Sequence, residues 1–111
     1  MWSTFKYMWH RVLKWDKVAR DAAGGINVPI YPPPDLVWSD AFDAAHAARS
    51  HEVHAQVYER ASIHGSCLVL EGVPIEALAP TRAFFDMVVR KADHDAAHVI
   101  EQREALRRSA A

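Results

Sequence analysis

The stretch SCLVLEGVP (66–74) decides the fold class predicted for this chain. Its apolar run, CLVL at 67–70, has the length and composition of a short buried strand. A strand needs a partner for its backbone N–H and C=O groups, and the neighbouring sequence offers no clear one. We therefore interpret 66–74 as a buried connector between helices, and this interpretation predicts an all-α fold.

Helical patterns flank this connector on both sides. Residues 40–63 are rich in alanine and are predicted to form a helix. Ser39 and Asp40, at its beginning, are residue types that favour the start of a helix. A last helix is predicted to begin at Pro80 and to extend to about Arg108. Its apolar residues recur with the helical period and form one face: Phe85, Val88, Val89, Ala92, Ala96, Val99, Ile100 and Leu106.

The N-terminal stretch MWSTFKYMWHRVLKW (1–15) predicts a basic, aromatic, amphipathic helix over residues 1–21. Basic residues beside tryptophans suit an anionic membrane surface, although a targeting peptide and a helix that packs on protein show the same pattern. We expect a retained docking helix that packs on its own chain or a partner, or lies on anionic lipid. The residues predicted to dock are Trp2, Phe5, Lys6, Trp9, Lys14, Trp15 and Lys17.

The segment between the first two helices is rich in proline and glycine. Gly24 and Gly25 end the first helix, and four prolines by position 34 exclude a regular helix. Residues 22–38 are therefore predicted to form an extended connector. Together these predictions describe one small helical domain, 1–111: three helices joined by long irregular segments, with residues 39–111 as the helical body.

Charge and cysteine content exclude several classes of protein. The net charge of −1 argues against nucleic acid as a general partner, because phosphate binding needs an excess of basic residues. Residues 1–20 nevertheless carry five basic residues and one acidic residue, so the positive charge gathers at the N-terminus. Cys67 is the only cysteine and cannot form a disulfide within the chain. No apolar run approaches the length of a membrane span.

The stretch HDAAH (94–98) carries the strongest pattern for enzymatic chemistry. Two histidines four residues apart on a helix can share a metal ion, as in zinc hydrolases. His94 and His98, however, are predicted to lie opposite the apolar face beside Arg90 and Glu101, on a solvated surface. We expect no catalytic residue, no metal and no cofactor, and keep a small metal-dependent hydrolase as the rival interpretation.

Three short motifs together resemble a known family. The family is the small matrix-side "subunit 7" (ubiquinone-binding-protein) family of the mitochondrial cytochrome bc1 complex, in which similar motifs stand in a similar order. The motifs in this sequence are Lys14-Trp15 followed by Ala22-Ala23-Gly24, Tyr58-Glu59-Arg60-Ala61, and Val99-Ile100 followed by Arg103-Glu104. The segment VPIYPPPDLVW (28–38) departs from that family. The resemblance implies an all-α subunit without catalytic residues that clamps cytochrome b to the core proteins.

These observations predict a non-catalytic accessory subunit of a respiratory complex in the mitochondrial inner membrane, with ubiquinol–cytochrome c reductase (bc1, complex III) as the leading choice. An accessory subunit of complex I, cytochrome oxidase or ATP synthase fits the same pattern. The expected location is peripheral, on the matrix side. The expected partners are other subunits of a large membrane complex, and the N-terminal helix can also contact anionic lipid.

Overall fold

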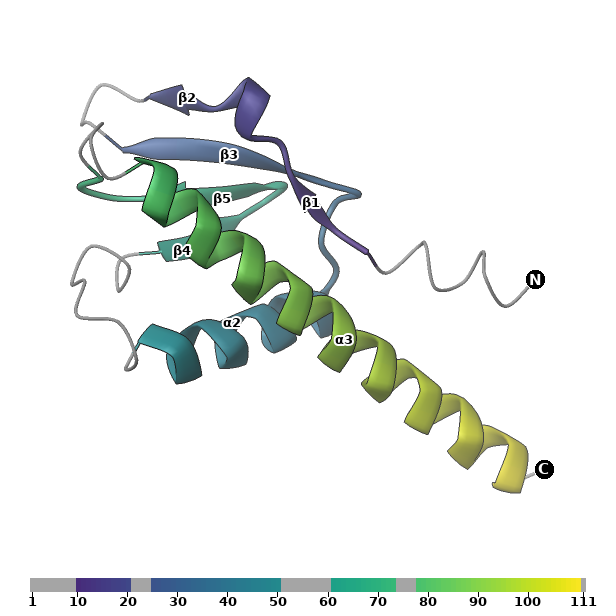
Figure 1. The fold of residues 1–111 in the computed structure, drawn as a ribbon. Helices are drawn as coiled ribbons and strands as arrows, with labels where there is room; N and C mark the ends of the chain where they lie inside the picture. Colours follow the sequence, from purple (N-terminus) through teal and green to yellow (C-terminus); the bar gives the residue numbers. More distant parts are fainter. Residues whose placement is uncertain (1–9, 21–24, 51–60, 74–77, 111) are drawn as a thin grey trace.

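The computed structural model describes residues 10–20, 25–50, 61–73 and 78–110, and in these ranges it combines two α-helices with a five-stranded antiparallel sheet (Figure 1). The predicted all-α fold with three helices is therefore wrong. The elements in chain order are β1 (Val12–Leu13), the 3-10 helix η1 (Trp15–Lys17), β2 (Ala19–Arg20), β3 (Ile26–Tyr31), α2 (Leu36–Ser50), β4 (Ala61–His64), β5 (Cys67–Leu70) and α3 (Leu78–Ala110).

The stretch 66–74 contains a strand with partners on both sides, where the sequence predicted a connector. β5 pairs antiparallel with β3 on one side and with β4 on the other. β4 and β5 are joined by Gly65 and Ser66, and Gly65 has φ 60°, the left-handed conformation that tight hairpin turns reserve for glycine. Because β4 occupies positions assigned to a helix over 40–63, its pairing was not anticipated.

β3 lies where the extended connector 22–38 was predicted, and it contains a proline. Pro29 cannot donate a ladder hydrogen bond. The carbonyl of Pro29 accepts a hydrogen bond from the Lys14 backbone N–H at 2.8 Å, on the side where β1 has ended and β2 has not begun. A strand residue directs its N and O to the same side, so the missing N–H falls in this gap. The proline is therefore compatible with an inner strand.

The described part of the N-terminal segment forms short strands instead of the predicted amphipathic helix. β1 and β2 pair with opposite ends of β3, and η1 connects them. The burial of Leu13 and Trp15 in the core explains this conformation, because tertiary packing overrides a helical pattern. Residues 1–9, with four of the predicted docking residues, lie outside the described ranges.

The helical body predicted over 39–111 is also wrong, although one of its helices is confirmed. α2 begins at Leu36, earlier than predicted, because the Asp35 carboxylate accepts a hydrogen bond from the Trp38 backbone N–H at 2.8 Å and caps the first turn. Within the described residues α2 extends to Ser50, and β4 and β5 follow before α3. α3 agrees with the helix predicted from Pro80 to about Arg108.

One hydrophobic core joins the sheet to both helices. Alternate residues of β3 and β5 are buried, so one face of the sheet packs on α2 and α3. Figure 1 shows α3 crossing the sheet with α2 beside it. The large, fully buried side chains at the centre are Trp38, Phe42, Phe85, Ile26, Leu68, Leu70, Val28 and Val88. In the described ranges, neither helix combines the length and the hydropathy needed to cross a membrane.

Candidate functional site

A buried aspartate joins three segments of the chain. Asp93, on α3, accepts a hydrogen bond from the Arg11 backbone N–H at 2.9 Å and one from the Trp38 indole N–H at 2.8 Å, both at Oδ1. Its Oδ2 lies 3.8 Å from His10 Nδ1. The carboxylate therefore fixes the start of β1 and the first turn of α2 against α3.

Arg11 extends this cluster toward the start of α2. Its side chain is buried, and Nη2 donates to the Pro33 carbonyl at 3.1 Å and lies 3.5 Å from Asp35 Oδ2. The guanidinium carbon lies 5.9 Å from the centroid of the Trp38 ring, within cation–π range. The guanidinium of Arg11 thus contacts both the segment before α2 and the aromatic core, while its backbone N–H donates to Asp93.

Burial raises the pKa of Asp93, because an apolar surrounding disfavours the charged carboxylate. The hydrogen bonds from Arg11 and Trp38 oppose this shift and lower the pKa, as do the charges of His10 and Arg11. A buried acid with a raised pKa can serve as a proton donor or acceptor. Here, however, Oδ1 is already occupied by two structural N–H groups, so the arrangement favours a structural role.

The raised pKa of Asp93 predicts a specific pH dependence of stability. The native state holds this proton more tightly than the unfolded state, whose aspartate pKa is about 3.9. Between these two pKa values the native state binds more protons, so the contribution of Asp93 to the free energy of unfolding falls as the pH rises. We expect wild type to gain stability relative to Asp93→Asn as the pH is lowered from neutrality toward the ordinary pKa of an aspartate, about 3.9. Urea unfolding across this range measures the difference, and a constant or shrinking difference on acidification would contradict the assignment.

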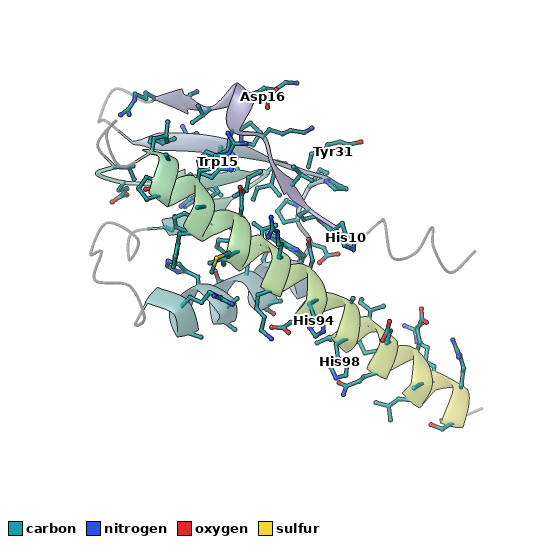
Figure 2. The ribbon with its side chains drawn as sticks, in the orientation of Figure 1. His10, Trp15, Asp16, Tyr31, His94 and His98 are labelled. Carbon is teal, nitrogen blue, oxygen red and sulfur yellow. The ribbon has the colours of Figure 1, made fainter. Side chains whose placement is uncertain are left out.

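An open groove of about 340 Å³ borders Asp93 and runs along one side of α3. Its charged and titratable groups come from the start of the described chain and from successive turns of α3. Figure 2 shows the labelled His94 and His98 on the same side of α3. The groove is lined by His10, Arg90, Asp93, His94, Ala97, His98 and Glu101.

His94 and His98, the candidate metal ligands, lie on the exposed side of α3 with Arg90 and Glu101, as the helical spacing indicates. The His94 side chain is 78% exposed, and its Nδ1 lies 3.3 Å from Asp95 Oδ1. His98 Nε2 lies 3.2 Å from Gln102 Nε2. Partial burial raises the pKa of the Asp95 carboxyl. The hydrogen bonds and charges of Lys91 and His94 lower this pKa by more, so it lies below its usual value. No group of three or more histidine, cysteine, aspartate or glutamate side chains in the described ranges could hold a metal ion.

Three of the predicted docking residues lie in the described ranges, and the structure separates them. Trp15 is only 9% exposed, and its indole N–H donates to Asp86 on α3 at 2.9 Å. Trp15 therefore joins the N-terminal segment to the core of its own chain. Lys17 is exposed, and Lys14 Nζ lies 5.8 Å from the centroid of the Tyr31 ring. Trp2, Phe5, Lys6 and Trp9 lie outside the described residues.

Sequence reasoning missed Asp93 and Arg11. One signal was present for Asp93: it follows Val89 by four residues and precedes Ala96 by three, so it lies at the border of the apolar face of the helix. An acidic residue at that position needs a hydrogen-bond donor. The donors come from Arg11 and Trp38, which are distant in the sequence, and no local pattern identifies them.

Comparisons with protein-family models, with curated proteins and with solved structures gave no match.

Proposed function

We propose that this protein is a non-catalytic accessory protein that docks on a larger protein assembly through the free end of α3. The observation that supports the proposal is the length of this helix. Over the part of α3 whose burial the structure describes, the last buried residue is Ala96, whereas the helix continues to Ala110. The distal segment of α3, residues 97–110, adds about 21 Å of helix beyond the core at 1.5 Å per residue.

Figure 1 shows this distal segment extending away from α2 and from the sheet, and the molecule measures 53 × 28 × 19 Å. A helical extension receives little stability from packing inside its own chain, and isolated helices of this length are marginal in water. A partner surface would supply the missing packing. The hydrogen bonds of Asp93 and Arg11, polar residues beside the core, join segments of the fold. This structural use favours a binding role for the protein over a catalytic one.

The particular assembly we propose is a respiratory complex of the mitochondrial inner membrane, with a bc1-type complex first. This choice rests on the resemblance of three short motifs: Lys14-Trp15 followed by Ala22-Ala23-Gly24, Tyr58-Glu59-Arg60-Ala61, and Val99-Ile100 followed by Arg103-Glu104. The all-α fold that the resemblance implied is not the fold of this chain, so fold similarity lends it no support. Accessory subunits of complex I, cytochrome oxidase and ATP synthase are proposals of the same class.

Gentle detergent extraction of a tagged chain, followed by a native gel and mass spectrometry of the co-migrating proteins, tests this proposal. We expect the chain to migrate with a large complex, and cytochrome b with its partners would identify the bc1 type. Truncation after Ala97 should abolish co-migration and leave the core folded, because residues 98–109, the deleted residues whose burial the structure describes, include no buried side chain. Migration of the full chain alone would overturn the proposal.

The rival from another class is a metal-dependent hydrolase that uses His94 and His98. Elemental analysis of the purified protein separates the two proposals. Stoichiometric zinc that is lost in a His94→Ala, His98→Ala double variant would favour the hydrolase.

A further inference from the structure

The distal segment of α3 continues the face that packs in the core. Val88, Ala92 and Ala96 are buried and follow one another in steps of four residues, and the same face continues through Val99, three residues on, and Leu106, seven residues after that. Val99 and Ile100 are half-buried, and Leu106 is 69% exposed. This spacing is the one by which two helices pack side by side.

Two arginines lie on this continued face. At 100° per residue, Arg103 lies about 40° from Val99, on the side toward Ile100, and Arg107 lies beside Ile100. We call these five residues the distal stripe: Val99, Ile100, Arg103, Leu106 and Arg107. In the described part of the chain, Arg103 and Arg107 form no ion pair, whereas Arg108, on the opposite side of the helix, lies 3.6 Å from Glu104.

We propose that the distal stripe binds an acidic amphipathic helix of a partner protein. This inference rests on the proposed docking function and names the chemistry of the partner. Apolar partner residues would cover Val99 and Leu106. Partner carboxylates would face Arg103 and Arg107, because an arginine that is covered by an interface needs a carboxylate or a carbonyl opposite it.

Charge distinguishes this partner from the other candidates. A second copy of the chain would bring two sets of Arg103 and Arg107 together, and like charges oppose that contact. A membrane surface suits a wide apolar face with aromatic residues at its edge. The distal stripe has three apolar side chains and no aromatic one, and Glu101 and Glu104 lie on the same segment. A helix with leucines and carboxylates matches both features of the stripe.

Two designed peptides test the inference. Both are three-heptad amphipathic helices with leucines at the contact positions; one carries glutamates and the other lysines beside the leucines. Fluorescence anisotropy of each labelled peptide with the full chain should show about tenfold tighter binding of the glutamate peptide, which corresponds to about 1.4 kcal/mol. High salt should weaken this preference.

An Arg103→Glu, Arg107→Glu variant should reverse the preference, so that the lysine peptide binds more tightly. The matched control is Arg90→Glu, Arg108→Glu, which changes the net charge equally on the opposite side of α3 and should leave the preference unchanged. All four positions are exposed, and circular dichroism checks that both variants fold. Equal binding of the two peptides, or loss of preference in the control, would overturn the inference.

Other occupants give different results. A dimer in analytical ultracentrifugation that dissociates on Leu106→Glu would replace the acidic helix by a second copy. Flotation with phosphatidylserine vesicles that requires Arg103 and Arg107, without discrimination between the peptides, would replace it by a membrane. Co-migration with a large complex that persists in the Arg103→Glu, Arg107→Glu variant would overturn the inference and leave the proposed function standing. Preference for the glutamate peptide without co-migration of the full chain would support the acidic-helix chemistry and overturn the proposed function.

Discussion

Replacement of Asp93 by alanine is expected to lower the free energy of unfolding by about 2–4 kcal/mol. The substitution leaves the backbone N–H of Arg11 and the indole N–H of Trp38 without their acceptor in a buried environment. Each unsatisfied buried donor costs roughly 1–3 kcal/mol, and relief of the buried carboxylate charge offsets part of the loss. Urea unfolding followed by tryptophan fluorescence measures the change.

Two further variants separate the hydrogen bonds from the charge. Asp93→Asn retains a carbonyl oxygen that can accept both N–H groups, so it should lose less stability than the alanine variant. Asp95→Ala, two residues away on the exposed side of α3, removes an ion pair with Lys91 at 3.0 Å and should cost less than about 1 kcal/mol. Equal losses at positions 93 and 95 would show that Asp93 does not join the three segments energetically.

The sequence predicted those parts of the fold that depend on local pattern. α3 was predicted because its apolar residues recur with the helical period over many turns, and burial of Phe85, Val88 and Ala92 follows that pattern. The pairing of β3 with β5 was missed because it is non-local: Ile26 lies opposite Leu70. The local pairing of β4 with β5 was missed because a helix was assigned over 40–63, which includes most of β4. Nothing within a short window indicates a partner for β3, and its prolines and glycines were interpreted as an extended connector.

The described part of the N-terminal segment, residues 10–20, was misassigned for a related reason. Its aromatic spacing fits a helix, but Trp15 gains more from burial and from its hydrogen bond to Asp86 than a helical conformation would provide. The candidate site, too, was predictable only where it depends on local sequence pattern. His94 and His98 could be placed from their helical spacing, whereas the contact between Asp93 and Arg11 depends on how β1 reaches α3.

Replacement of Phe85 by alanine is expected to lower the free energy of unfolding by about 3–5 kcal/mol. Phe85 is fully buried on α3, and its ring centroid lies 6.5 Å from that of Phe42 and 5.7 Å from that of His46. Phe84 meets it edge to face at 5.0 Å. The substitution removes a large apolar side chain from the contact between the two helices and leaves a cavity that rigid neighbours fill only in part.

Leu106→Ala on the same helix is the matched control, because it also shortens an apolar side chain to a residue with high helix propensity. Leu106 lies beyond the core and is 69% exposed, so its loss should change stability by less than about 0.5 kcal/mol. Urea midpoints should therefore move strongly for Phe85→Ala and very little for Leu106→Ala, with similar slopes of the transition. Comparable shifts for the two variants would mean that the distal segment of α3 packs on its own chain, and the docking proposal would then lose the observation on which it rests.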